Sequence, residues 1–259
     1  MRARLAIVLV GARNPSNIGA AARAIRDFGF GDLRIVNEYA PPFEAARLQS
    51  PSSASDGSKA AVGAAEVLAS ARRFDRLEDA ITDCTLIAGT TAIGGRELKQ
   101  AVVTLTEAAP QIVAGLATHK IALLFGSEKT GLTNDQLSHC QLLLTIPMFA
   151  PVDSRHLSMN LGQAVAVCLY ELVREGFEGA RELPDTGPKE VTAGERERLT
   201  QLLLESMEAT GYTRRFPANA REHVVRQLAQ QLGASEAEAS TWMGFLRQVL
   251  RRTKKEAPR

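Results

Sequence analysis

The chain has 259 residues, of which 45% are hydrophobic and 23% charged, a composition typical of folded proteins rather than of disordered or fibrous ones. Lysine and arginine total 31 against 29 aspartates and glutamates, so the formal charge of +2 argues against a strongly basic nucleic-acid binder. Every apolar run falls short of the ~20 residues that a membrane helix needs. The cysteines, Cys84, Cys140 and Cys168, are odd in number and widely spaced, so we expect buried free thiols in a cytoplasmic protein with no membrane partner.

Short β-branched runs alternate with alanine-rich helical patterns over residues 1–175. The runs that we predict as strands are residues 5–10, 33–36, 86–88, 121–125 and 142–146. This alternation predicts an α/β fold with a largely parallel sheet and helices on both faces.

The first predicted strand leads into a segment with clear helix-start signals. Asn14 suits the N-cap, Pro15 the first helical position and Gly29 the C-terminal stop, which predicts a helix over about residues 15–28. Free amides at such a helix start can bind an anion, and Asn17 adds a polar group there. Arg23 lies further along this predicted helix, on a face of the helix that is either solvent-exposed or part of a binding surface.

A second loop, residues 126–131, follows the strand at 121–125. It lacks the Lys-Ser/Thr pair that a phosphate-binding loop places after its second glycine, and neither loop has the glycine spacing of a dinucleotide fold. A tight turn would explain Gly126 and Gly131 but would leave Glu128 unexplained. Thr133 and Gln136 then form a capping box that predicts a short helix.

A third polar segment begins after Ile146 and ends at the start of a helix that continues to about residue 175. Ser158 and Asn160 both sit at that start, and an N-cap accounts for only one of them. Apart from the adjacent His139 and Cys140, the four histidines have no Cys or His partner at metal-ligand spacing, so we expect no metal site.

The composition changes near residue 176. Residues 176–189 are rich in glycine and proline and read as a linker, and three helical patterns follow at 196–210, 219–232 and 236–253. We therefore divide the chain into residues 1–175, the linker 176–189 and a helical C-terminal domain, residues 190–259. Both chain ends are locally basic, at 1–26 and 247–259, which makes a polyanion partner more plausible, although a solvated tail is the simpler explanation for either end alone.

Taken together, the three loops carry Asn17-x-Gly19-x-x-x-Arg23, Gly126-x-Glu128-x-x-Gly131-Leu132 and, after Ile146-Pro147, Ser158-x-Asn160-Leu161. This ordered set resembles the SPOUT class of S-adenosylmethionine-dependent RNA methyltransferases. Within that class it is similar to the TrmH/TrmJ-type tRNA ribose 2'-O-methyltransferases, and the helical extension resembles the TrmJ branch.

The resemblance implies a C-terminal trefoil knot, a homodimer, and 2'-O-methylation of a tRNA ribose, at cytidine or uridine 32 of the anticodon loop. It implies a catalytic set made of Arg23, Asn17, Glu128, Ser158 and Asn160. It also implies an S-adenosyl-L-methionine pocket lined by Thr90, Thr91, Ala92, Gly126, Ile146, Leu157, Ser158 and Met159.

The chemistry of such a transfer requires alignment and stabilisation of the ribose oxygen as it loses its proton. A guanidinium is always protonated, so we expect Arg23 to orient a phosphate and stabilise the oxygen, while the proton leaves to Glu128, a phosphate or water. The alternatives are methylation of ribosomal RNA or of another tRNA position, or a knotted RNA-binding protein without catalysis.

Overall fold

The computed structural model describes residues 2–36, 64–92, 100–149, 159–174, 190–233 and 235–256. Its strands are β1 (Leu5–Val10), β2 (Asp32–Val36), β3 (Arg72–Phe74), β4 (Leu86–Thr90), β5 (Val102–Thr104), β6 (Ile121–Phe125) and β7 (Leu142–Thr145). Its helices are η1 (Arg2–Arg4), α1 (Pro15–Asp27), α3 (Ala65–Ser70), α4 (Leu77–Ile81), α5 (Leu105–Gly115), α6 (Asn134–Leu137), α7 (Leu161–Arg174), α8 (Ala193–Ala209), α9 (Tyr212–Arg215), α10 (Glu222–Leu232) and α11 (Glu236–Glu256).

The strands form one sheet in the order β3-β2-β1-β6-β4-β7-β5, and every neighbouring pair is parallel. This confirms the predicted α/β architecture, and all five predicted strands are present. The edge strands β3 and β5 were not predicted, because three residues are too short a run to show a period of two.

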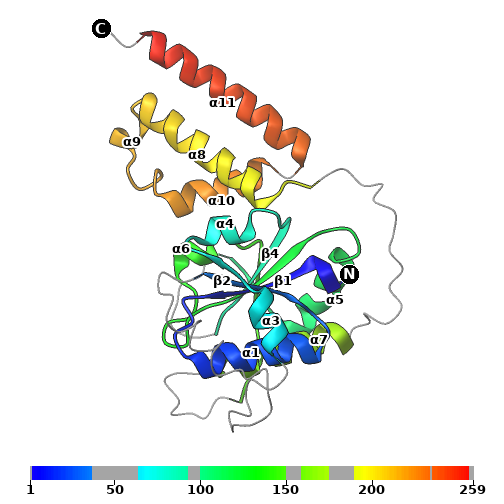
Figure 1. Ribbon diagram of the computed structural model, residues 1–259. Coiled ribbons are helices and arrows are strands. Elements are labelled where there is room, and N and C mark those ends of the chain that lie inside the picture. Colours follow the sequence, from blue (N-terminus) through cyan, green and yellow to red (C-terminus); the bar gives the residue numbers. More distant parts are fainter. Residues whose placement is uncertain are drawn as a thin grey trace.

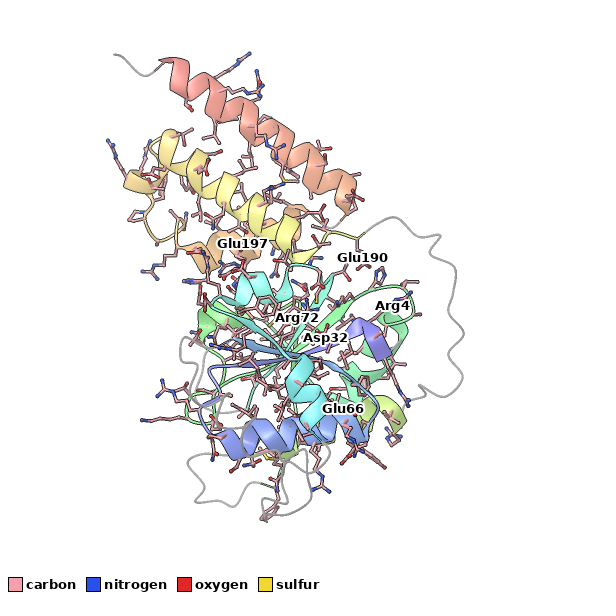
Figure 2. The ribbon with its side chains drawn as sticks, viewed as in Figure 1. Arg4, Asp32, Glu66, Arg72, Glu190 and Glu197 are labelled. Atoms are coloured by element: carbon pink, nitrogen blue, oxygen red, sulfur yellow. The ribbon has the colours of Figure 1, made fainter. Side chains whose placement is uncertain are left out.

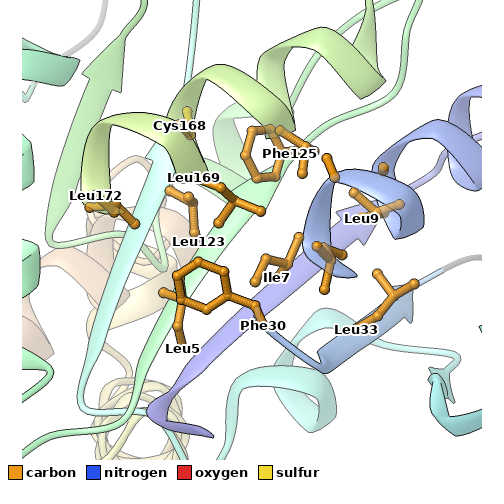
Figure 3. Close-up of a cluster of buried hydrophobic side chains, with 14 of the residues drawn as sticks. Leu5, Ile7, Leu9, Phe30, Leu33, Leu123, Phe125, Cys168, Leu169 and Leu172 are labelled. Carbon is orange, nitrogen blue, oxygen red and sulfur yellow. The ribbon is translucent and has the colours of Figure 1, made fainter. Parts of the chain in front are cut away.

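Both faces of the sheet are buried, which the alternation in β1 illustrates. Leu5, Ile7 and Leu9 point into the larger core cluster, whereas Ala6 and Val8 point into the smaller one. The larger cluster is closed by α1, α3, α5 and α7, and Figure 3 shows Leu169 and Leu172 of α7 over the β1 side chains. The other face is covered by α4 and α6 (Figure 1). A sheet buried on both sides explains why its central strands are apolar throughout.

The helical extension, residues 190–256, lies over α4 and α6, and α11 forms its outer layer (Figure 1). It has a small core of its own, formed by Leu199, Leu203, Val225, Ala229 and Leu246. The amide of Ala193 donates to the Cys84 carbonyl, and Arg196 Nη1 donates to the Thr85 carbonyl, both at 2.8 Å. All three predicted helices are present, and α8 begins earlier than predicted because Thr192 and Glu195 form a capping box.

Two parts of the sequence-based description lie outside the described residues. The linker, residues 176–189, is one, so the division into two domains stays a prediction. The trefoil knot is the other, because the structure describes the chain between residues 64 and 174 only in part, so the knot also stays a prediction.

One buried ion network closes the sheet edge where β2 begins. Arg34 is 1% exposed, and its guanidinium lies 2.8 Å from Asp32 Oδ2 and 2.5 Å from Asp83 Oδ1. Asp32 also pairs with Arg72 of β3 at 3.0 Å, and the two residues lie side by side in Figure 2. Burial alone would lower the pKa of Arg34, but its hydrogen bonds to Asp32 and Asp83 outweigh that effect and raise it. The network lies where strands begin, away from the loops described next.

Candidate active site

The polar loops identified in the sequence meet at the carboxyl edge of the sheet. Gly11 follows β1, Gly126 follows β6, Thr91 follows β4 and Ile146 follows β7, and these four strands are neighbours. The chain order reverses here, since β2 and β3 lie on one side of β1 and the later strands lie on the other. In open α/β sheets a crevice forms outside the strand ends at such a reversal, and ligands bind in it.

The start of α1 is built as predicted. Asn14 has extended backbone angles and its side chain accepts from the Ser16 amide at 2.9 Å, and Pro15 is the first helical residue. At the other end the helix stops at Gly29, whose φ of +76° favours glycine. The Gly11 amide donates to the Val36 carbonyl at 2.8 Å, which fixes the turn between β1 and α1.

The 126–133 loop, which joins β6 to α6, is a tight turn. Ser127 and Gly131 pair across it, and the Gly131 amide donates to the Ser127 carbonyl at 2.8 Å. A Cβ on Gly126 would lie 2.1 Å from backbone atoms of Gly131 and Leu132, so only glycine fits there. The turn therefore accounts for both glycines, and Glu128 has a separate role.

Glu128 holds the start of α1. Its carboxylate accepts from the backbone amides of Arg13 and Asn14, each at 3.2 Å, and from Asn17 Nδ2 at 3.0 Å. Burial acts to raise the pKa of Glu128, but these hydrogen bonds outweigh it and lower the pKa below its ordinary value of 4.5. The group is therefore ionised near neutral pH, and a low pKa together with three donors makes it a weak proton acceptor.

Asn17 connects this loop to the third polar segment. Its Oδ1 accepts from Asn160 Nδ2 at 2.8 Å, although the two residues are 143 positions apart. Asn160 Oδ1 in turn accepts from the Gly162 amide at 3.0 Å, so Asn160 begins α7 and also reaches α1. The two helices can approach this closely because residue 162 is a glycine. Any other residue would place a Cβ only 2.5 Å from Ala20 Cβ.

Three of the five residues in the expected catalytic set, Asn17, Glu128 and Asn160, are thus joined in one hydrogen-bonded chain. Arg23 lies six residues beyond Asn17 on α1, about 9 Å along the helix axis. Its side chain is 47% exposed, and its Nε is 3.6 Å from Asp27. Ser158 lies outside the described residues.

The expected cofactor residues lie at the same edge of the sheet. The Thr90 hydroxyl donates to the Leu124 carbonyl at 2.9 Å, and the Thr91 amide donates to the Leu144 carbonyl at 2.9 Å. Both bonds tie the end of β4 to a neighbouring strand. Ala92, Gly126, Ile146 and Met159 are also at least partly exposed, whereas Leu157 lies outside the described residues.

A cavity of about 420 Å³ opens between the first two loops. Its lining residues are Arg13, Asn14, Pro15, Asn17, Ser127, Glu128 and Lys129. Two of them, Arg13 and Lys129, are cations that the sequence analysis did not single out, although they directly adjoin Asn14 and Glu128. Since Glu128 is already engaged by three donors, these side chains favour an anionic ligand such as a phosphate.

The described parts of the chain hold no group of three or more His, Cys, Asp or Glu side chains arranged to bind a metal ion. Nor do they contain a helix long and apolar enough to cross a membrane.

Comparisons with known proteins identify a family, similar sequences and a similar structure. The model of the SpoU rRNA Methylase family matches residues 4–170. A Pseudomonas aeruginosa protein named tRNA (cytidine/uridine/adenosine-2'-O-)-methyltransferase TrmJ is 32% identical, and the alignment covers 98% of this chain and 95% of that protein. A Sodalis glossinidius protein named tRNA (cytidine/uridine-2'-O-)-methyltransferase TrmJ is 29% identical over 97% of this chain and 93% of its own. The crystal structure of TrmJ from Z. mobilis ZM4 superposes with a TM-score of 0.72 at 28% identity, covering 94% of this chain and 98% of that one.

Proposed function

Because the chain belongs to the SpoU rRNA methylase family, we propose that it transfers a methyl group from S-adenosyl-L-methionine to the 2'-hydroxyl of a tRNA ribose. The observation that carries this proposal is the hydrogen-bonded chain Glu128–Asn17–Asn160, which joins the three predicted motifs beside a cavity with cationic side chains. The near full-length similarity to proteins named as tRNA methyltransferases includes the helical extension and favours tRNA over ribosomal RNA.

The residues at the carboxyl edge fit S-adenosylmethionine. The set offers backbone groups at strand ends, the threonine hydroxyls, and the apolar side chains of Ile146 and Met159, which suit a purine ring. We therefore assign Thr90, Thr91, Ala92, Gly126, Ile146, Leu157, Ser158 and Met159 to the cofactor pocket. When bound, the cofactor supplies an electrophilic methyl group on a sulfonium.

The chain's own part in the reaction is positioning and charge stabilisation. Asn17 and Asn160 fix the start of α7 against α1, and Glu128 fixes the start of α1, so the ribose meets a rigid surface. Arg23, permanently charged and half exposed on α1, orients a phosphate and stabilises the ribose oxygen as its proton leaves. The hydrogen bonds of Glu128 favour a phosphate or water as the proton acceptor. Ser158 completes the catalytic set by its place in the third motif.

The substrate position is the finer part of the proposal. By resemblance to the TrmJ branch we assign cytidine or uridine 32, with the protein acting as a homodimer in the cytoplasm. The exposed ring of Tyr170 on α7, which packs edge-on against Phe28 of α1, offers an apolar surface for the second subunit.

Nucleoside mass spectrometry on unmodified tRNA, incubated with the protein and S-adenosylmethionine, tests the proposal. We expect one 2'-O-methylated pyrimidine per tRNA, and fragment mapping to place it at nucleotide 32. Arg23→Ala should abolish transfer, and Arg26→Ala, which removes an exposed arginine of the same helix, is the matched control. Full activity of Arg23→Ala would contradict its role. Absence of methyl transfer by the wild-type protein, with tRNA binding retained, would favour the non-catalytic RNA-binding alternative.

A further inference from the structure

An arginine of the helical extension is buried and plays no part in the chemistry described above. Arg226 of α10 is 2% exposed. Its Nε lies 3.0 Å from Glu197 Oε2 of α8, and its Nη2 lies 2.5 Å from Glu222 Oε1. Glu197 lies in the N-terminal part of α8 (Figure 2). These contacts stay within the extension and would by themselves describe a structural ion pair.

The third guanidinium nitrogen of Arg226, Nη1, contacts the α/β part of the molecule at α6. Arg226 Nη1 donates to the Ser138 hydroxyl at 3.0 Å and to Asp135 Oδ1 at 3.3 Å. One turn later, Gln230 Nε2 donates to the Ser138 carbonyl at 2.8 Å. Asp135 lies in α6, and Ser138 is the C-cap residue of α6. The side chains of Arg226 and Gln230 on α10 therefore hold the end of α6.

The short helix α6 depends on such support. It has four residues, far fewer than the ~12 that an isolated helix needs to be even marginally stable in water. Its other anchors are the Thr133–Gln136 capping box and the buried side chain of Leu137, which joins the core on that face of the sheet.

A displacement of α6 would be transmitted to the 126–133 loop. The loop runs directly into the Thr133 cap, and Leu132 is only 2% exposed. The backbone of Gly131 and Leu132 packs against Gly126 so closely that even a Cβ would not fit between them, so this part of the loop is in direct contact with the end of β6. Glu128, at its tip, carries the hydrogen bonds to α1.

We propose that Arg226 is a positioning residue through which the docked extension holds α6, and thereby keeps the 126–133 loop and Glu128 in place against α1. The inference rests on the proposed function only in so far as Glu128 belongs to the site of methyl transfer. It gives the extension a role in shaping the site, in addition to any contact with RNA.

The guanidinium is suited to this role by its shape. Its planar fork bonds Glu197 and Glu222 on one side and reaches Ser138 on the other, which the single ammonium of a lysine cannot do. Burial acts to lower the pKa of Arg226, but the hydrogen bond to Glu197 and the nearby carboxylates raise it, so the charge is permanent. Without Arg226, three carboxylates would face one another across the contact with α6.

Amide hydrogen exchange of the full-length protein, measured by mass spectrometry, tests the proposal without requiring activity. In Arg226→Met we expect the protected amides of Gly131, Arg13 and Asn14 to exchange about tenfold faster, while the β1 amides stay unchanged. Arg226→Lys should show a partial effect. Gln230→Met, which removes only the neighbouring contact with α6, should show a smaller effect of the same kind in a folded protein.

Two matched variants separate this coupling from general damage. Arg221 is the exposed N-cap residue of the same helix, α10. Arg221→Met therefore removes the same charge without removing a contact with α6, and it should leave loop exchange unchanged. Arg196→Met weakens the docking of the extension at the Thr85 carbonyl, away from α6, and should also leave the loop unchanged. An equal rise in Arg196→Met and Arg226→Met, or unchanged loop exchange in both Arg226→Met and Gln230→Met, would overturn the proposal.

Steady-state kinetics add a second measurement. A positioning role predicts that kcat of Arg226→Met falls about tenfold, while KM for tRNA changes by less than about twofold. If the wild-type protein transfers no methyl group, the proposed function fails, and the exchange data still decide the role of Arg226 independently.

Discussion

Replacing Glu128 with glutamine separates a positioning role from a role in proton transfer. The glutamine oxygen can still accept from the Asn14 amide and from Asn17 Nδ2, which both bond Oε1 of the carboxylate. The new NH₂ group would take the place of Oε2 and face the Arg13 amide, donor against donor. The change therefore removes one hydrogen bond and the negative charge while it preserves the size of the side chain.

The expected magnitude follows from that count. A hydrogen bond to a charged group contributes about 1.5–3 kcal/mol, and partial exposure of this one reduces the loss to about 1–2 kcal/mol of unfolding free energy. If the transition state for methyl transfer loses the same stabilisation, the rate falls about tenfold, since 1.36 kcal/mol corresponds to a factor of ten. Chemical denaturation and single-turnover methylation of tRNA measure the two effects separately.

The pH dependence gives a third, independent measurement. The pKa of Glu128 lies below 4.5, so the carboxylate is ionised throughout pH 6–9. Its contribution to stability is fully present above that ordinary value and is lost only as the pH falls through the lowered pKa of the folded state. We therefore expect wild type and Glu128→Gln to have rate profiles of the same shape between pH 6 and 9.

The matched control is Glu195→Gln. Glu195 caps α8 through the Thr192 amide and hydroxyl, and α8 starts beside Cys84 at the opposite edge of the sheet, so its replacement should cost some stability and leave methyl transfer intact. A loss of about a thousandfold in Glu128→Gln, with a changed pH profile, would identify Glu128 as the proton acceptor and refute the positioning role. An unchanged rate of methyl transfer would also refute the positioning role, because that role predicts a loss of about tenfold.

Three further predictions concern packing and burial. Gly162→Ala places a Cβ 2.5 Å from Ala20 Cβ, so we expect a loss of about 1–3 kcal/mol in unfolding free energy and a weaker methyl transfer, measured by thermal melting and activity. Arg34→Met should destabilise the fold by about 1–3 kcal/mol in denaturant titrations, because it removes the hydrogen bonds from a buried guanidinium to Asp32 and Asp83, which then keep Arg72 and Lys120 as partners; a loss below about 0.5 kcal/mol would contradict this. Burial raises the pKa of each thiol to about 12, so iodoacetamide at pH 8 should label the unfolded but not the native protein at Cys84, Cys140 and Cys168.

The sequence by itself determined the local structure wherever the signal lies within a few residues. The run in β1 has the composition of a strand buried on both faces, and Asn14, Pro15 and Gly29 mark both ends of α1 within a residue or so. Thr133 and Gln136 likewise identified α6. The three motifs were recognisable because each directly follows a strand or begins a helix.

Tertiary structure decided what depends on contacts between distant parts of the chain. The strand order, the edge strands β3 and β5, and the bond between Asn17 and Asn160 leave no periodic trace in the sequence. Glu128 looked free to accept a proton until the fold supplied two backbone amides from the start of α1, which no local pattern encodes. Arg226, in turn, appears in the sequence as one arginine among many in the extension. Its burial against α6 arises only because α10 packs there, and pairing over such separations depends on the free energy of the whole packed state rather than on local propensity.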